Sequence, residues 1–447
     1  MKKRVILSQF VRYAGLNVLG MIGISCYVLA DTFFISKGMG TDGLAALNFA
    51  LPAYSIMYGC GLMKGVGGST LYNVYKERGD EKAGKRTFVN SLIAGAIFSV
   101  IFFVVGAFFP GQAVALLGAK EGAVAEMCET YFKVLWMFSP AFVLNSIVLS
   151  FLRNDGAPTV AMIGMVTGSL MNILLDWAFI FPLKMGIFGA ILATGLSPII
   201  SLIVYIPYFL RKKNGFSIGK TPIEPKLCGK AMLIGFPSFL AEISIATVTF
   251  CFNKIMFGLK GNVGVAAYGV IANVVVVVLA MFNGIASGAQ PLISKFYANE
   301  NKPAVKKVLF LTAVSTAIVG IAVYVTAYFS ADFIAGIFNS ENNVEMQTLA
   351  VRGVKLYFIG SLFAGLNILT STYFAAREKT VRAQAVSIAR GFAVILPAAF
   401  IMAKTLGTDG LWLSFPTAEI IVLALSLTLI ITEFVKERRT DKKSLNM

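Results

Sequence analysis

The chain has 447 residues, of which 57% are hydrophobic and only 14% are charged, and its mean hydropathy is +0.78. Soluble proteins carry about 25% charged residues, so this composition excludes an ordinary water-soluble fold. The chain contains no histidine, which excludes zinc hydrolases of the HExxH type and His-dependent triads. The cysteines have no metal-ligand spacing and are expected to be buried small side chains. They are Cys26, Cys60, Cys128, Cys228 and Cys251.

Twelve windows of about 20 mainly apolar residues, the length that crosses the hydrocarbon core of a bilayer, follow one another along the chain. They predict spans at residues 13–36, 44–72, 88–112, 127–151, 158–182, 187–210, 232–257, 264–292, 308–337, 350–376, 383–404 and 408–432. Only helices and closed barrels satisfy their backbone groups in lipid. The sequence therefore predicts an all-α polytopic protein embedded in the lipid bilayer.

The positive charge is distributed unevenly between the segments that connect these spans. Lys and Arg number 39 against 22 Asp and Glu, a net charge of +17, which in a soluble chain would suggest a nucleic-acid partner. With the N-terminus placed in the cytoplasm, 28 of the 39 fall in inner segments and only 5 in outer ones. This bias predicts a multi-pass protein of the cytoplasmic membrane with both termini cytoplasmic. It leaves no reason to expect nucleic-acid binding.

The chain contains an internal repeat with an offset of 221 residues. The shift aligns Gly43-Leu-Ala-Ala46 with Gly264-Val-Ala-Ala267 and Lys85-Arg86 with Lys306-Lys307. Each half holds six spans, an even number, so we expect two six-helix lobes related by a pseudo-twofold axis along the membrane normal. The predicted domains are an N-terminal lobe at 1–210, a basic cytoplasmic linker at 211–230 and a C-terminal lobe with a short cytoplasmic tail at 231–447.

Two equivalent bundles around a cavity are typical of an alternating-access transporter. A channel would more naturally show a filter sequence or a ring of charges in the pore, and neither is evident. No GxxxxGK[ST] phosphate-binding motif occurs in the sequence. Transport is therefore expected to use an ion gradient rather than ATP hydrolysis by this chain.

Four motifs in order along nearly the whole chain resemble the multidrug and toxic compound extrusion (MATE) family, in its bacterial DinF-like or MepA-like branch. They are Ala30-Asp-Thr-Phe-Phe-Ile35, Phe151-Leu-Arg-Asn-Asp-Gly-Ala-Pro158, Asn172-Ile-Leu-Leu-Asp176 and Gly235-Phe-Pro-Ser-Phe-Leu-Ala-Glu242. The resemblance implies a V-shaped pair of six-helix lobes that exports organic cations in exchange for Na⁺ or H⁺. It implies no enzymatic activity and no cofactor apart from that coupling ion. The protein is expected to be a monomer.

Ionisable residues inside a span are costly and are functional candidates by default. Asn172 and Asp176 are four residues apart and share a helix face. A carboxylate with an amide oxygen suits a small hard cation, and burial also lets an Asp take up a proton. The resemblance implies a cation-coupling cluster, with Asp31 and Asp176 as possible Na⁺ ligands. Its members would be Asp31, Asn172, Asp176, Thr194, Tyr131 and Asn145. The alternative is that Asp176, near the outer end of its span, is merely solvated.

The second lobe has two intramembrane acids of its own, Glu242 and Glu419. In another branch of the family a Glu at the first position acts with an Asp in the tenth span, where this chain has Ala364. Glu242 is therefore expected to meet a cationic substrate or to form a structural pair with Lys254 or Arg390. Glu419 is a weaker candidate for the same role. The 221-residue shift places no acid opposite Asp31, Asp176 or Glu242, so the lobes are expected to have different tasks.

The sequence leaves two alternatives to multidrug export. A lipid-linked oligosaccharide flippase of the same superfamily would favour several Arg and Lys around its cavity to hold pyrophosphate, and intramembrane cations are few here. An intramembrane enzyme is less favoured, because the chain shows no histidine and no recognisable nucleophile motif.

Overall fold

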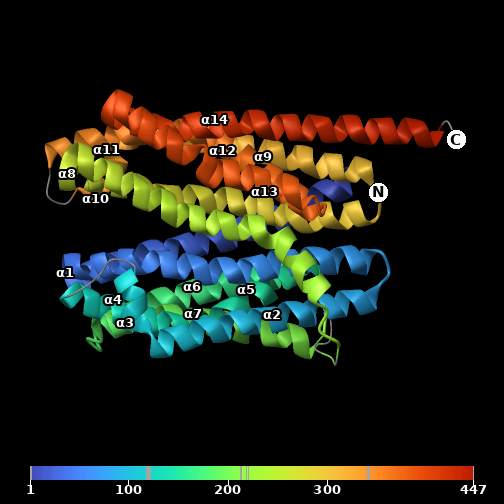
Figure 1. Cartoon of the computed structure of the whole chain (residues 1–447), viewed down its shortest axis with the longest axis horizontal. Coiled ribbons are helices and arrows are strands. Elements are labelled where there is room, and N and C mark those ends of the chain that lie inside the picture. The colour runs from blue at the N-terminus through green and yellow to red at the C-terminus, as the bar shows by residue number, and fades with distance from the viewer. Residues whose placement is uncertain are drawn as a thin grey trace. The chain divides into compact units, whose positions relative to one another are not determined.

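The computed structural model describes residues 3–116, 122–211, 214–217, 219, 221–339 and 343–445. Lys120, one of the cations counted in the outer segments, lies outside the described residues. So do positions 212, 213, 218 and 220 of the predicted linker. Within these ranges every regular element is helical (Figure 1). The elements are α1 (Lys3–Glu77), α2 (Glu81–Phe108), α3 (Pro110–Leu116), α4 (Ala123–Met137), α5 (Ser139–Asn154), α6 (Pro158–Ile180), α7 (Gly186–Leu210), α8 (Pro225–Ala298), α9 (Lys302–Phe329), α10 (Ala331–Phe338), α11 (Val344–Tyr357), η1 (Phe358–Gly360), α12 (Ser361–Ala376), α13 (Thr380–Ile388), η2 (Ala389–Ala393) and α14 (Ile395–Leu445).

Three helices are too long to be single membrane spans. α1 has 75 residues, and at about 1.5 Å per residue a straight helix of that length would be several times longer than the hydrocarbon core is thick. Each long helix contains one glycine with non-helical backbone angles: Gly40 in α1, Gly261 in α8 and Gly407 in α14. Their φ angles are +66°, +59° and +63°, a region that costs glycine little and other residues much. Each glycine therefore separates two consecutive spans.

These turns repeat the internal symmetry of the sequence in the backbone itself. Gly40 and Gly261 are 221 positions apart, and so are Gly186 and Gly407. Gly186 has a φ of +58°, which is close to that of its counterpart. The repeat thus specifies the turn between the first two spans and the turn between the last two spans of each half.

When α1, α8 and α14 are each counted as two spans, the described residues hold one helical segment for each of the twelve predicted spans. The predicted span 127–151 is a bent pair, because α4 and α5 meet at an angle of 50° just before Pro140, which lacks a backbone N–H. The predicted span 350–376 comprises α11, η1 and α12. The span 383–404 comprises α13, the π turn η2 and the first part of α14.

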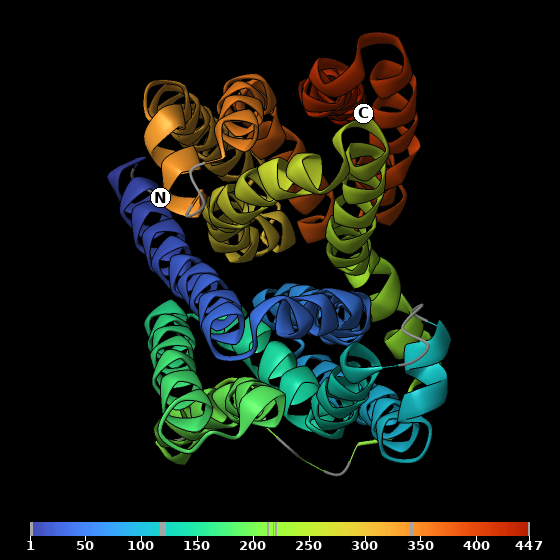
Figure 2. The same ribbon diagram turned by 90° about the vertical axis from the view of Figure 1, so that its left-hand side faces the viewer.

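The described helices form two compact units, which we treat separately. The first unit contains Met1–Ala246 and Asn283–Val308, and the second contains Thr247–Phe282 and Leu309–Met447. In the first unit α6 packs on α7, and α1 packs on α5 and α6 (Figure 2). In the second unit α12 packs on α13 and α14. The helix α8 contributes residues to both units, so this division by contacts differs from the predicted division of the sequence.

Small residues set the helix separation in the first unit. A Cβ atom added at Gly65 of α1 would lie 2.6 Å from the carbonyl oxygen of Ser146 in α5, and one added at Gly68 would lie 2.1 Å from Ser91 Oγ in α2. Both distances are far below van der Waals contact. The glycines therefore permit backbone-to-backbone packing of the kind that stabilises helix association in lipid.

Asp155 joins the ends of several helices of the first unit. Its Oδ1 accepts a hydrogen bond from the Tyr72 hydroxyl at 2.5 Å. The same oxygen forms an ion pair with Lys76 Nζ at 2.5 Å. Its Oδ2 accepts hydrogen bonds from Tyr208 at 2.7 Å and from the backbone N–H of Gly215 at 2.9 Å. This carboxylate is 1% exposed and both of its oxygens have partners, so it acts as a structural anchor for the segment that follows α7.

Candidate functional site

The polar cluster predicted for the N-terminal half is assembled in the first unit. Asn172 and Asp176 lie on one face of α6 and are both 0% exposed, and Thr194 faces them from α7. With its amide nitrogen toward Asp176, Asn172 donates to Asp176 Oδ2 at 3.1 Å and accepts from the Thr194 backbone N–H at 3.2 Å. The Asn172 amide also lies 3.4 Å from the Thr194 hydroxyl. Because Asp176 is buried, the alternative that it is merely solvated loses its support.

Asp31 reaches the same cluster from α1. It is buried, and its carboxylate is close enough to Asp176 for the two charges to repel one another. The hydroxyl group of Tyr131 on α4 lies within electrostatic range of both carboxylates. An apolar wall surrounds the group, because Ile35 and Ile180, one helical turn beyond the two acids, belong to the same buried core. Four helices of the first unit thus converge on two acids.

Neither of these carboxylates is satisfied by the protein. Asp31 Oδ1 and Asp176 Oδ1 are buried and have no hydrogen-bond partner among the described residues, and no described Lys or Arg forms an ion pair with either acid. Buried polar atoms without partners are rare in native structures and require a specific explanation. Two adjacent carboxylates are stabilised by a shared proton or by a bound cation.

The donor set limits which cation could bind at this site. No group of three or more Asp, Glu, Cys or His side chains that could hold a metal ion occurs among the described residues. The available ligands are two carboxylates, a hydroxyl and an amide oxygen. Such a set suits a monovalent hard cation or a proton better than a divalent ion, which takes more carboxylate charge.

Asn145 lies on α5, three residues after Phe142 of the same buried core. Its Oδ1 is buried without a partner among the described residues, so it offers another free oxygen in this unit. The structure shows no hydrogen bond between Asn145 and the two acids, and its membership of the coupling cluster stays a prediction.

Glu242 lies on α8 but belongs by its contacts to the first unit. Phe239 and Glu242 face Gly59 of α1, where an added Cβ would lie 3.0 Å from the Phe239 ring and 3.4 Å from Glu242 Cβ. The carboxylate is within electrostatic range of Tyr54 and Tyr58. These two tyrosines stack with their ring centroids 5.4 Å apart. Sequence reasoning did not identify them, because aromatic residues in apolar spans carry no distinguishing pattern.

Glu419 has a different environment in the second unit. The Nε of Arg390 donates to Glu419 Oε1 at 2.7 Å, and Asn367 Nδ2 donates to Oε2 at 2.7 Å. Ser426 in turn donates to Asn367 Oδ1 at 2.8 Å. Arg390 lies on η2, a π turn, a feature that is frequent at functional sites. The predicted alternative partner of Glu242, Arg390, is thus engaged by Glu419.

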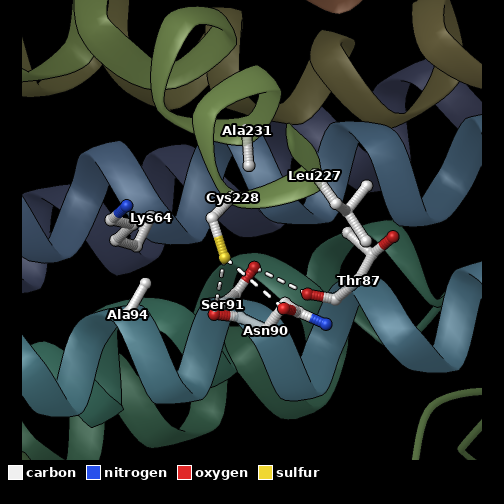
Figure 3. A pocket seen from close by; sticks show the side chains of 8 residues that line it. All are labelled: Lys64, Thr87, Asn90, Ser91, Ala94, Leu227, Cys228 and Ala231. Atoms are coloured by element: carbon white, nitrogen blue, oxygen red, sulfur yellow. Dashed lines mark hydrogen bonds between the residues drawn. The ribbon is translucent and has the colours of Figure 1, made fainter. Parts of the chain in front are cut away.

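The first unit also contains a narrow pocket beside Lys64 (Figure 3). Lys64 is 1% exposed, and its ammonium lies 5.3 Å from the centroid of the Phe98 ring. On the opposite wall the Cys228 thiol points toward Asn90, whose Oδ1 is 3.5 Å away. The pocket is too narrow to admit a water molecule, so we do not assign it a substrate.

Comparisons with known proteins identify the family. A family model described as MatE matches residues 18–178 and 237–401, which is well over half of the chain. The chain belongs to the MatE family. The resemblance noted in the sequence is therefore confirmed.

Two relatives carry the name multidrug export protein MepA. The protein of this name from Staphylococcus saprophyticus is 26% identical over 99% of this chain and 97% of its own length. The one from Staphylococcus aureus strain MSSA476 is 26% identical over 98% and 96%. The similarity thus extends over the whole chain, including the segments between the two parts that the family model matches.

Solved structures confirm the fold class. A multidrug resistance MATE family transporter in an outward-facing conformation superposes with a TM-score of 0.90 at 22% identity, over 96% of each chain. A transporter of the MOP superfamily from Pyrococcus furiosus superposes with a TM-score of 0.87 at 23% identity, over 94% of each chain. The MatE-family chain is thus an all-α membrane protein of twelve helices in two lobes. Because its family consists of transporters, it is not an enzyme.

Proposed function

We propose that this MatE-family protein exports lipophilic organic cations from the cytoplasm in exchange for Na⁺ or H⁺. The observation that carries the proposal is the pair of buried carboxylate oxygens, Asp31 Oδ1 and Asp176 Oδ1, that have no partner. A site that leaves acidic oxygens unsatisfied in an apolar environment is suited to a cation that binds and leaves. The names of the curated relatives support export of several compounds.

The coupling step follows from the electrostatics of the cluster. Without a bound cation, two ionised carboxylates on α1 and α6 repel one another. Binding of a proton or Na⁺ between Asp31 and Asp176 removes that repulsion and favours close packing of the two helices. Asn172 and Thr194 hold Asp176 in place during this change. Because a ligand shifts a conformational equilibrium only by its differential affinity for the two states, this difference in packing couples ion binding to the conformational change, and the ion gradient supplies the free energy.

Glu242 is the candidate contact for the substrate. Its carboxylate lies among Tyr54, Tyr58 and Phe239, and no described Lys or Arg forms an ion pair with it. A carboxylate beside aromatic faces suits a flat organic cation, which gains both charge attraction and cation–π contact. Glu419 is less suited to this role, because both of its oxygens already have partners in the protein.

The membrane placement of the protein is part of the same proposal. The 28 Lys and Arg of the inner segments against 5 in the outer ones support the cytoplasmic membrane as the location, with both termini in the cytoplasm. A single chain contains both six-span halves of the repeat, so we propose that a monomer is the functional unit. This distribution of charge accounts for the basic excess without a nucleic-acid partner.

Substrate efflux from proteoliposomes under an imposed Na⁺ gradient, and then under an imposed pH gradient, tests the proposal. We expect one of the two gradients to drive efflux in the wild type and neither to do so in Asp176→Asn. The control is Asp409→Asn, which changes an acid that pairs with Arg352 at a more exposed position. Undiminished gradient-driven efflux by Asp176→Asn would remove the site assignment.

The flippase alternative is not favoured. It requires several cations around a cavity to hold a pyrophosphate group, whereas the described intramembrane Lys64 lines a pocket too narrow for water and Arg390 is engaged by Glu419. The full-length curated relatives are named as multidrug exporters.

A further inference from the structure

The first unit buries a guanidinium that has no acidic partner among the residues that the structure describes. Arg153, at the end of α5, is 8% exposed. Its Nη2 donates to the thioether sulfur of Met165 at 3.1 Å, and a thioether is a weak acceptor. Its Nε is buried and has no partner among the described residues. A buried arginine held only by a sulfur atom is an exception that needs a physical explanation.

A second unsatisfied donor lies beside this guanidinium. Tyr205 on α7 is 0% exposed, and its hydroxyl is also buried without a partner. Arg153 and Tyr205 lie within electrostatic range of one another, and they contact neighbouring residues of α6, Met165 and Gly164 respectively. The Tyr205 ring is held by Gly164 of α6, where an added Cβ would lie 2.0 Å from it. The glycine thus provides the space that directs the tyrosine into this position.

The nearby acid Asp155 forms no ion pair with Arg153. Asp155, two residues further along, has both of its oxygens occupied by Tyr72, Lys76, Tyr208 and the Gly215 N–H. The Tyr58 hydroxyl also lies within electrostatic range of Arg153, and Leu149, Leu152 and Met165 belong to the same buried core as Tyr205. The site therefore contains hydrogen-bond donors and a positive charge but no anion.

We propose that Arg153 and Tyr205 form a binding site for a single small anionic group. The chemistry fits a monovalent anion, which accepts hydrogen bonds from the guanidinium Nε and from the tyrosine hydroxyl and neutralises the buried charge. Chloride and the carboxylate of an organic compound share this chemistry. The site is distinct from the Asp31–Asp176 cluster, whose free groups are acceptors and therefore suit a cation.

The proposal predicts a chloride-dependent stability of the purified full-length protein. The midpoint of thermal unfolding is measured in detergent while chloride replaces isethionate, a bulky sulfonate without a carboxylate, at constant Na⁺ and constant ionic strength, so that cation binding does not change. A ligand that binds only the folded state raises stability with the logarithm of its concentration above Kd. We expect a chloride-dependent rise of the midpoint in the wild type and none in Arg153→Gln.

Two tyrosine variants provide a test that does not depend on the folding of Arg153→Gln. Tyr205→Phe keeps the ring against Gly164 but removes one donor, and we expect it to weaken chloride binding about tenfold, the effect of one hydrogen bond to a charged group. Tyr208→Phe is the matched control on the same helix, because its hydroxyl bonds Asp155 instead. It should leave chloride affinity unchanged.

The outcomes distinguish the sources of the anion. A larger rise with acetate than with chloride would support the site and assign it to carboxylate-bearing compounds. The absence of any effect of either anion on the wild type would overturn the proposal. An equal effect on the wild type, Arg153→Gln and Tyr205→Phe would also overturn it. None of these results depends on whether Asp31 and Asp176 couple transport.

Discussion

The two units of the molecule differ in how many of their buried charges have a fixed counter-charge. In the first unit, Asp155 is paired with Lys76, but Asp31, Asp176 and Arg153 have no ion-pair partner among the described residues. In the second unit, Glu419 is paired with Arg390, and Arg377 forms ion pairs with Glu433 and Glu437.

The contrast is sharpest between Arg153 and Arg377, which lie at helix ends that match in the sequence repeat when the offset is 224 rather than 221 residues. Arg377 has two carboxylates and the Tyr373 hydroxyl, whereas Arg153 has a thioether sulfur. A buried charge without a fixed counter-charge costs free energy unless a ligand provides one. The duplicated scaffold therefore leaves three buried charges of the first unit available for the ligands we propose, whereas the buried charges Glu419 and Arg377 of the second unit are held in ion pairs.

The largest expected effect concerns the two free carboxylates. Asp31→Asn should reduce gradient-driven efflux at least tenfold, because a single carboxylate no longer forms the shared cation site. The double variant with Asp176→Asn should be no worse than either single variant, since groups that act as one unit are not additive. Transport assays at equal protein levels measure this. Independent losses that multiply in the double variant would contradict a shared site.

The second prediction concerns the ion pair between Arg390 and Glu419 in the second unit. Arg390→Met leaves the Glu419 carboxylate buried without its cation and should lower the free energy of unfolding by about 3–5 kcal/mol. Replacing both residues, Arg390→Met with Glu419→Met, should restore much of this loss, since an apolar pair needs no counter-charge. Unfolding in detergent measures both variants. A double variant as unstable as the single one would argue against a purely structural role for this pair.

A third prediction compares the two equivalent arginines. In isethionate without chloride, Arg377→Gln should destabilise the protein by about 1–3 kcal/mol, because it removes charge-assisted hydrogen bonds to Glu433 and Glu437. Arg153→Gln should cost nothing measurable under the same condition, because it removes a charge that has no partner. The two unfolding curves, recorded in parallel, provide the comparison. Equal losses would contradict the contrast between the units.

The smallest expected effect is a pH dependence at Lys379, outside the predicted spans. Burial and then the neighbouring Arg377 and Arg382 lower the pKa of Lys379 to about 8 from 10.5. Between these values the unfolded chain binds more protons than the folded one, so the free energy of unfolding should rise with pH from about 8 to 10.5. Lys379→Met should remove that part of the rise. A variant with the wild-type pH profile would exclude this contribution.

The sequence predicted the helical fold well, because the thickness of the bilayer fixes the length of an apolar span at about twenty residues and the spans of each half can be counted directly. It also placed Asn172 and Asp176 on one helix face, since their spacing of four residues is a local property. The burial of Asp176 could not be read from the sequence, because its position near the end of a span is compatible with solvation.

Ion-pair partners that are distant in the sequence could not be predicted from local patterns. Nothing local indicates that Arg390 selects Glu419 rather than Glu242, because that choice depends on how α13, η2 and α14 pack. The isolation of Arg153 was equally hidden. Its loop resembles that of Arg377 in the repeat, and only the tertiary structure shows which of the two has acidic neighbours.

The most direct measurement of the central claim is coupling-ion binding by the purified protein, read as proton release at fixed Na⁺ and as Na⁺ binding at fixed pH. Three proteins are compared: the wild type, Asp31→Asn with Asp176→Asn, and Arg390→Met with Glu419→Met. We predict that the first-unit variant loses ion binding and that the second-unit variant retains it. Loss of ion binding in the second-unit variant, with retention in the first-unit variant, would contradict the account.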